Sequence, residues 1–380
     1  MPDDIHKFKK EFDKAGKKLY VVGGAVRDFY QNFNPHDIDL VTDAQPEETK
    51  EILKDFNVSD EQGKNFGVLR IFTKSEPAGY EIATFRKDIS KGRDTKGDEQ
   101  KVEIGKHITI EDDVKRRDLT QNALFYDIDK EEIVDLVGGV EDINNNVISA
   151  VGDASQRFIE DRLRILRTFR FASRNKSKIS QTTIDAIIKD KRLRNVSPVD
   201  DVSQERIVEE FVKAVDWASE NKRLGSLNFY LELLDKYDMF DEMFPELDID
   251  IEGIETFNLV IIFALLFRDN TNINDLRTKL RKYKFPNNIA DTACFLLRLR
   301  KNLHNLDEVS VLYKGKVRFH VDNKTIEEFA DLYNFNDNYL KAFLKFTPKI
   351  DTTEINKMFK GAERGVEVKR REIEEFKKLL

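Results

Sequence analysis

A Gly-Gly pair followed by an arginine opens the stretch VVGGAVRDFYQNFNPHDIDLV, residues 21–41. Gly23 and Gly24 have no Cβ, so a turn that they form lets backbone N–H groups approach an anion closely. Arg27 adds a guanidinium, whose fork of N–H donors suits phosphate oxygens. We therefore expect residues 23–27 to bind phosphate.

Two aspartates close the same stretch. Asp37 and Asp39 bracket an apolar residue, and this alternation predicts a half-buried strand with both carboxylates on its open face. Paired carboxylates suit Mg²⁺, which keeps water and substrate phosphates in its remaining positions. Two such ions about 3.5–4 Å apart can share this pair and hold the attacking and leaving oxygens of a phosphoryl transfer. Glu81, on a later predicted strand, is either a third carboxylate of this site or an ordinary surface residue.

A second polar motif is VKRRDLTQNALFYD, residues 114–127. Arg116 and Arg117 offer forked donors to phosphate. Asp118 and Asn122 are one helical turn apart, so a helix would place both on one face, where they could hold the hydroxyls of a ribose. The alternative is a helix N-terminus with ordinary surface charges.

The third motif is RFIEDRLRILRTFRFASR, residues 157–174, which has the period of one continuous amphipathic helix. At about 100° per residue, its polar front is centred on Glu160 and includes arginines within about 40° of that residue. The members of this front are Glu160, Arg164, Arg167 and Arg174, with Asp161 and Arg170 on its flanks. So many arginines along one edge favour a binding surface for anions over surface decoration.

Strand patterns dominate the first 140 or so residues, and helical patterns dominate the rest. The predicted strands lie within residues 18–24, 36–42, 66–72, 79–86, 123–129 and 131–137, with a helix at 45–56. The later helices are predicted at residues 156–174, 180–193, 203–220, 224–240, 255–267 and 362–380. Strands with short connections and few helices predict an α+β sheet domain, followed by an all-helical part. Residues 87–101 contain a single apolar side chain, which predicts a mobile loop over the sheet domain.

The charge is unevenly distributed. The 380-residue chain has a formal net charge of −7, yet residues 156–194 hold twelve Lys or Arg against four Asp or Glu, a local charge of +8. A basic block in an acidic chain is typical of a polyanion-binding site. One cysteine, Cys294, excludes an intramolecular disulfide, and the longest apolar run, residues 259–267, is too short to span a bilayer. We therefore expect a cytoplasmic protein.

Together the motifs resemble the class II tRNA nucleotidyltransferases (CCA-adding enzymes) and the related bacterial poly(A) polymerases. The matching stretches are GGAVRD with DID, RRDLTQNAL, EDRLRILRTFRFA and a weaker VSQERI, which together span about residues 20–210. The resemblance implies a head domain similar to DNA polymerase beta, followed by a helical neck, body and tail. Two residues depart from the family pattern: Arg162 stands where proline is usual, and Gln121 stands where an apolar residue is usual.

The resemblance also implies roles for individual residues. Asp37 and Asp39 would bind catalytic Mg²⁺, with Glu81 as the candidate third carboxylate. The nucleotide would be bound by Gly23, Gly24, Arg27, Arg117, Asp118, Asn122, Glu160, Asp161, Arg164, Arg167 and Arg170. The substrates would be CTP, ATP and the 3′ end of tRNA, with the basic neck and helical tail holding its acceptor arm.

Base selection has a physical explanation in two of these residues. Asp161 can accept the exocyclic N–H of cytosine or adenine, while Arg164 donates to their ring acceptors. Uracil and guanine would instead turn a carbonyl oxygen toward the carboxylate, and mismatches of this kind can cost a factor of about 10⁴ or more. One pair of side chains can thus accept C and A without a template.

The expected division is a head at residues 1–148, a neck at 149–225, a body at 226–310 and a tail at 311–380. Three alternatives stay open on the same scaffold: a poly(A) polymerase, an enzyme that adds only CC or only A, and a catalytically silent RNA-binding protein. The 87–101 loop favours full CCA addition, because the resemblance assigns this region a part in the switch from C to A. The oligomeric state stays undetermined.

Overall fold

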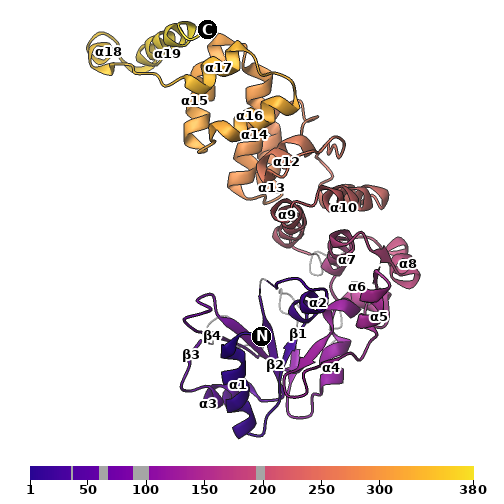
Figure 1. Cartoon of the computed structure of the whole chain (residues 1–380). Coiled ribbons are helices and arrows are strands. Elements are labelled where there is room, and N and C mark those ends of the chain that lie inside the picture. The colour runs from indigo at the N-terminus through magenta and orange to yellow at the C-terminus, as the bar shows by residue number, and fades with distance from the viewer. Residues whose placement is uncertain (36, 60–66, 89–101, 194–201) are drawn as a thin grey trace. The chain divides into compact units, whose positions relative to one another are not determined.

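The computed structural model describes residues 1–35, 37–59, 67–88, 102–193 and 202–380. These form two compact units, Met1–Val202 and Ser203–Leu380 (Figure 1). The boundary between the units falls inside the predicted neck, and the finer division into neck, body and tail stays a prediction. Of the polar segment 87–101, all but Lys87 and Asp88 lie outside the described residues, as does His36.

A mixed seven-stranded sheet forms the centre of the first unit, in the order β3-β4-β5-β2-β1-β8-β9. Its strands are β1 (Leu19–Val22), β2 (Asp39–Thr42), β3 (Asn57–Ser59), β4 (Val68–Phe72), β5 (Tyr80–Thr84), β8 (Phe125–Asp127) and β9 (Glu132–Val134). Neighbouring strands run antiparallel except β2 and β5, which are parallel. Two smaller sheets pair β6 (Arg86–Asp88) with β7 (Val102–Ile104), and β10 (Val147–Ile148) with β11 (Lys178–Ile179).

Both faces of the large sheet are buried, because side chains alternate along each strand. One face packs on α1 (Asp3–Lys14), whose Ile5, Phe8 and Phe12 are fully buried against Leu40 and Ile82. The opposite face holds a second apolar cluster that includes Val22, Val41 and Phe125. The helices of this region are α1, α2 (Gly24–Tyr30), α3 (Pro46–Ile52), α4 (Ile110–Lys115) and α5 (Gly139–Asn144).

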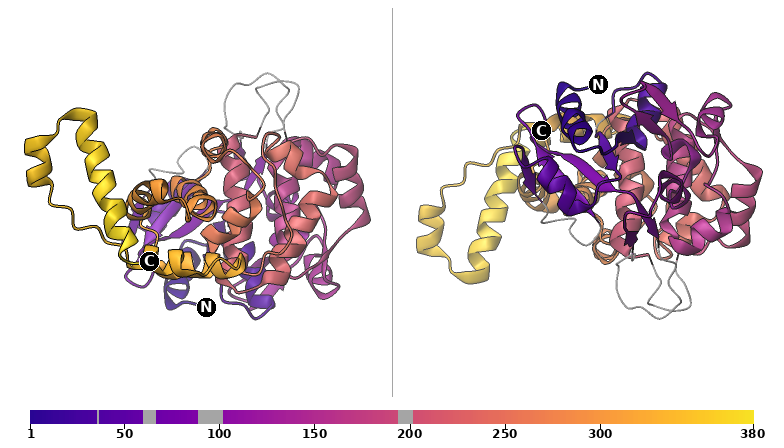
Figure 2. Two further views of the ribbon diagram at one scale, coloured as in Figure 1. Left: turned by 90° about the horizontal axis from the view of Figure 1, so that it is seen from above. Right: turned by 90° about the horizontal axis from the view of Figure 1, so that it is seen from below.

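The rest of the first unit is helical, with α6 (Ala154–Glu160), α7 (Leu163–Arg174) and α8 (Gln181–Lys189). The described part of the basic block predicted to bind polyanion, residues 156–193, spans these three helices and the segments that join them. The second unit is also helical and comprises α9 (Gln204–Glu220), α10 (Leu224–Lys236), α11 (Met239–Met243), α12 (Leu259–Leu266), α13 (Ile273–Lys282), α14 (Asn287–Asn302), α15 (Val309–Arg318), α16 (Asn323–Leu332), α17 (Asn338–Lys345), α18 (Thr352–Met358) and α19 (Gly361–Lys377). The views in Figure 2 show α18 and α19 as a pair at the C-terminal end of this unit.

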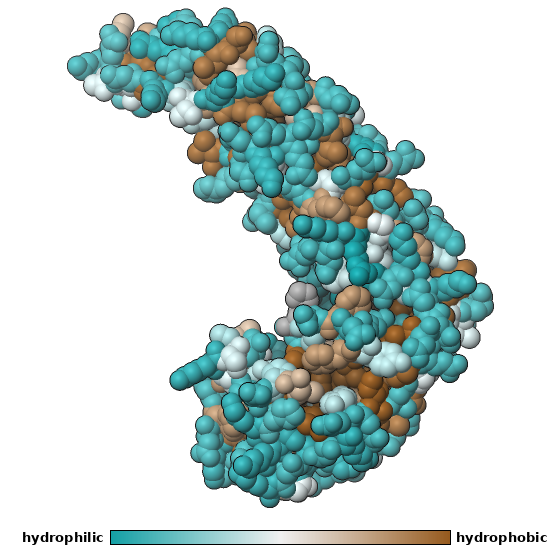
Figure 3. Space-filling model, viewed as in Figure 1, coloured by the Kyte–Doolittle hydropathy of each residue, from teal (hydrophilic) through white to brown (hydrophobic). Residues whose placement is uncertain are grey.

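The predicted α+β class is confirmed, and each strand predicted from the sequence is present. Hydrophilic side chains cover most of the face visible in Figure 3, with hydrophobic ones in smaller patches. Among the helices of the described ranges, none has both the length and the apolar character needed to cross a membrane.

One sequence prediction is wrong: residues 157–174 are not a single helix. The chain leaves the helical conformation at Asp161, which has φ −151° and ψ 105°, and α7 begins only at Leu163. The Asp161 carboxylate accepts a hydrogen bond from Leu163 N at 3.1 Å, a local bond that competes with helix continuation. The amphipathic pattern runs across this break because it reports apolar spacing and not backbone hydrogen bonds.

Candidate active site

The Gly-Gly turn joins β1 to α2. Gly23 has φ +75°, a conformation that disfavours residues with a Cβ, and its N–H donates to Leu124 O at 2.9 Å. The adjacent residue Val22 pairs with Asp39 across the β1–β2 ladder. The expected phosphate turn and the expected metal carboxylate are therefore neighbours, which their separation in the sequence did not require.

Asp37 and Asp39 occupy the start of β2. Asp39 is the first residue of the strand, Asp37 lies two residues before it, and both side chains are exposed. Although the Asp39 side chain is accessible to solvent, the protein atoms around it displace part of its hydration shell. This desolvation, and then the negative charges of Glu81 and Asp37, raise the pKa of Asp39 above its ordinary value. Within the described part of the chain, no hydrogen bond or ion pair is recorded for either aspartate. Two open, mutually repelling carboxylates fit a divalent cation, which would relieve their repulsion.

Glu81 lies beside this pair but is engaged elsewhere. β5 runs parallel to β2, and Leu40 pairs with Ile82, so Glu81 and Asp39 precede paired positions on adjacent strands. On its other side Glu81 faces Arg70 of β4 and forms an ion pair with it. No group of three or more His, Cys, Asp or Glu among the described residues is arranged to hold a metal ion. A ligand role for Glu81 thus stays a prediction.

Arg27 links the glycine turn to the second motif. Its side chain is buried, with its Nε donating to Asp28 Oδ1 at 2.8 Å and its Nη1 donating to Asn122 Oδ1 at 2.5 Å. Asn122 in turn donates through Nδ2 to Asp118 Oδ1 at 3.3 Å. The predicted contact between positions 118 and 122 therefore exists, but the helix expected there is only a short 3₁₀ turn, Thr120–Asn122.

Asp118 connects the sheet to α7. Its Oδ2 accepts from Arg167 Nε at 2.6 Å, and its Oδ1 accepts from Leu119 N at 2.8 Å. Burial alone would raise the pKa of Asp118, but Arg167 together with these hydrogen bonds outweighs it and lowers the pKa to about 2. Asp118 is therefore ionised at neutral pH and holds Arg167 against the head.

Arg117 and Arg116 depend on a buried carboxylate that the sequence did not single out. Asp113 of α4 is fully buried and accepts from Arg116 Nε at 2.8 Å and from Arg117 Nη2 at 2.7 Å. Burial raises the pKa of Asp113, but Arg117 and Arg116 outweigh it and the net shift is downward. The positive charge of Arg117 in turn lowers the pKa of Asp39, opposing the effect of burial there. The 3- and 4-residue spacing from Asp113 to the two arginines is the signal that could have revealed it.

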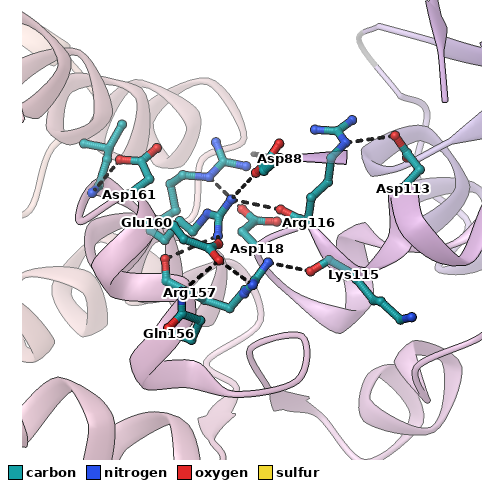
Figure 4. Close-up of polar contacts among 12 residues, drawn as sticks. Asp88, Asp113, Lys115, Arg116, Asp118, Gln156, Arg157, Glu160 and Asp161 are labelled. Carbon is teal, nitrogen blue, oxygen red and sulfur yellow. Dashed lines mark hydrogen bonds and ion pairs between the residues drawn. The ribbon is translucent and has the colours of Figure 1, made fainter. Parts of the chain in front are cut away.

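Glu160 lies at the end of α6 (Figure 4), and its carboxylate forms an ion pair with Arg164. Glu160 accepts from Arg164 Nη1 at 2.8 Å and from Arg157 Nη2 at 2.5 Å. Arg164 Nη2 donates to the Arg116 carbonyl at 2.8 Å, and Asp88 lies 3.6 Å from the same nitrogen. Arg164 is thus buried and held by protein groups, whereas the helical projection placed it on an open front.

Arg167 and Arg170 lie on α7 beside Arg27. All three guanidinium carbons are within 5.5 Å of the Phe171 ring centroid. The structure therefore brings together the glycine turn, Asp37 and Asp39 at the start of β2, the Arg116–Asp118 motif and α7 in one region of the first unit.

The two departures from the family pattern have structural explanations. Gln121 is buried and donates through Nε2 to Val147 O at 2.6 Å, which satisfies a carbonyl of β10. Arg162 precedes α7 and donates to Asp190 Oδ2 at 2.9 Å and to Arg192 O at 3.2 Å, which ties α7 to the end of α8. Both residues stabilise the packing beneath the site.

Comparisons with known proteins identify the family. Residues 19–149 match the model of the poly A polymerase head domain. The CCA-adding enzyme of Ligilactobacillus salivarius is 35% identical over 353 residues, an alignment that covers 90% of this chain and 82% of that protein. This chain belongs to the family of CCA-adding enzymes. The matched head-domain segment contains the large sheet and the first two motifs, whereas the third motif, residues 157–174, lies beyond it.

Solved structures of CCA-adding enzymes share the fold. One is the crystal structure of the Bacillus stearothermophilus CCA-adding enzyme in complex with CTP, with a TM-score of 0.63 at 22% identity over 97% of this chain and 81% of that one. Another is the complex of a CCA-adding enzyme with ATP, with a TM-score of 0.67 at 19% identity over 99% and 90% of the two chains. At these identities the likeness establishes the fold.

Proposed function

We propose that this protein is a template-independent RNA nucleotidyltransferase that adds C, C and A to the 3′ end of tRNA from CTP and ATP, releasing pyrophosphate. Membership of the CCA-adding enzyme family supports the reaction class. The observation that carries the proposal is that the charge of Arg117 acts on both Asp39 and Asp118, while Asp118 forms an ion pair with Arg167 of α7. A tRNA-maturing activity of this kind is expected in the cytoplasm.

The carboxylates of Asp37 and Asp39 would hold Mg²⁺. When bound, that ion would neutralise phosphate charge and activate the attacking oxygen, the chemistry that metal ions supply in phosphoryl transfer. The chain's own part is positioning and electrostatics: Arg27 and Arg117 stabilise charge on the phosphates, and no protein nucleophile takes part.

Asp118 and Asn122 are the groups we assign to the ribose. Both combine side-chain oxygens with fixed positions, because Asp118 is held by Arg167 and Asn122 by Arg27. Such fixed acceptors orient the sugar and with it the α-phosphate, and correct orientation alone can supply a large share of a rate enhancement.

Asp161 and Arg164 are the groups we assign to the base. Asp161 lies at the break between α6 and α7, where its backbone is extended. Arg164 is bonded through Nη1 and Nη2 to Glu160, Arg157 O and Arg116 O. A base that binds Arg164 must therefore displace some of these hydrogen bonds. Only cytosine and adenine compensate for the loss, because their donors and acceptors match those of Asp161 and Arg164.

The basic block of α6–α8 and the helices of the second unit would hold the tRNA by phosphate contacts. Such binding weakens as salt rises, because each phosphate contact releases counterions. The affinity for tRNA should therefore fall steeply between low and moderate salt.

The decisive experiment uses tRNA that lacks its last three nucleotides. It is incubated with Mg²⁺ and with CTP, ATP, GTP or UTP, singly and in pairs, and the product ends are sequenced. CC with CTP alone and CCA with CTP plus ATP are expected. Long runs of A would indicate a poly(A) polymerase, a product stopping at CC would indicate a partial enzyme, and no incorporation would contradict catalysis.

A further inference from the structure

Four arginines surround one aromatic ring in the first unit. The guanidinium carbons of Arg27, Arg167, Arg170 and Arg174 lie 4.8, 5.5, 4.2 and 4.8 Å from the centroid of Phe171. A cation within about 6 Å of a ring centroid is attracted by the negative face of the ring. One phenylalanine therefore contacts a cluster of charges that repel one another.

The arrangement follows from the positions of these residues. Arg167, Phe171 and Arg174 are spaced by four and three residues along α7, so they share one face of that helix. Arg27 reaches the same ring from α2, at the far side of the glycine turn. The cluster therefore bridges the head sheet and α7.

Burial makes the mutual repulsion costly. Arg27 and Arg170 are only 5% and 7% exposed. Burial first, and the positive charge of Arg170 in addition, lower the pKa of Arg27, although Asp28 opposes both. Like charges at low exposure interact more strongly than in water, and a bound anion would relieve this repulsion.

Two of the four arginines form ion pairs with carboxylates that also fix their direction. Arg27 pairs with Asp28, and Arg167 pairs with Asp118. These same partners hold the two guanidiniums toward the glycine turn and the ribose groups. The cluster thus lies where the polyphosphate of a nucleotide whose sugar contacts Asp118 would extend.

We propose that Phe171 is a positioning residue, whose ring holds the four guanidiniums together as one binding site for the polyphosphate of the incoming nucleotide. The inference rests on the proposed function and adds two residues to it, Phe171 and Arg174. Because CTP and ATP share the triphosphate, Phe171 serves both substrates equally and takes no part in choosing between them.

The test is a conservative series at one position, measured by equilibrium binding. Phe171→Leu retains apolar volume and removes the ring, whereas Phe171→Tyr retains the ring. Isothermal titration with inorganic tripolyphosphate should show affinity about tenfold weaker for Phe171→Leu, equivalent to about 1.4 kcal/mol, and close to wild type for Phe171→Tyr. The control is Phe158→Leu, the same change at a buried ring of α6, which should leave tripolyphosphate binding unchanged.

Kinetics provide a second readout. Phe171→Leu should raise KM for CTP and ATP by the same factor and leave the ratio of C to A incorporation unchanged. Equal tripolyphosphate affinity in wild type and Phe171→Leu would overturn the proposal, as would loss of binding in Phe171→Tyr. If Phe171→Leu does not fold, Phe171→Met should show the same weakening of tripolyphosphate binding.

Binding of tripolyphosphate does not depend on turnover. A protein that binds tripolyphosphate through this cluster without incorporating CTP therefore refutes the proposed function alone.

Discussion

Asp118→Asn tests the link between the sheet and α7 most directly. The substitution keeps the shape of the side chain and removes the charge that Arg167 contacts at 2.6 Å. In the folded protein the pKa of Asp118 falls from 3.8 to about 2. Each pKa unit corresponds to about 1.4 kcal/mol, so the ionised carboxylate contributes about 2 kcal/mol to the free energy of unfolding at neutral pH.

The sign of the pH dependence follows from the lowered pKa. A group whose pKa is lower in the folded state stabilises the protein above its unfolded pKa, here 3.8, and this contribution disappears as pH falls through about 2. The difference in unfolding free energy between wild type and Asp118→Asn should therefore be about 2 kcal/mol at pH 7 and about 1 kcal/mol smaller at pH 3.

The assay must report on the first unit. The only tryptophan, Trp217, lies on α9 of the second unit, so its fluorescence is unsuitable. Hydrogen exchange of peptides from β8 and α7, measured across urea concentrations at each pH, follows the relevant segments. Asp55→Asn, at an exposed position of the same unit, is the matched control and should leave the free energy of unfolding unchanged at both pH 7 and pH 3. If the free energy of unfolding differs between wild type and Asp118→Asn by the same amount at pH 7 and pH 3, the ion-pair reasoning is refuted.

Three further predictions concern the site and its support. Asp39→Ala should abolish nucleotide incorporation while a gel-shift assay shows unchanged tRNA binding; full turnover would remove the metal assignment. Asp161→Ala should relax nucleotide choice, seen as UTP or GTP incorporation, and unchanged selectivity would count against base reading by this carboxylate. Gln121→Leu should lower the free energy of unfolding by about 1–2 kcal/mol, because it leaves the Val147 carbonyl without its partner at 2.6 Å; thermal denaturation of Gln121→Glu and wild type alongside it checks the value.

Local patterns predicted the strands and the two ends of the opening motif. Alternation of apolar and polar residues located β2, and a Gly-Gly pair between a strand and a polar stretch located the turn at Gly23. Both signals act over a few residues, which is the range over which backbone sterics and side-chain direction operate. The pairing of Val22 with Asp39 then follows from the β1–β2 register, which sequence spacing alone does not specify.

The parts that escaped prediction depend on contacts between distant segments. Asp113 looks like one of many acidic residues in the sequence, and its carboxylate also accepts from the backbone N–H of Arg86, 27 residues earlier, a contact that no local spacing predicts. Phe171 looks like an ordinary helix aromatic until Arg27, from a different element, contacts its ring. Arg164 was expected on an open face, but the Arg116 carbonyl and Glu160 enclose it.

The parallel pairing of β2 with β5 has a consequence for synthesis on the ribosome. The strand that carries Asp39 pairs with β1, which is made shortly before it, but its other neighbour, residues 80–84, emerges about 40 residues later, and Arg167 later still. Nascent chains fold as units once their segments are available. A chain released before α7 has been made therefore has its acidic strand but lacks the arginines that complete the site, and premature termination should yield inert fragments.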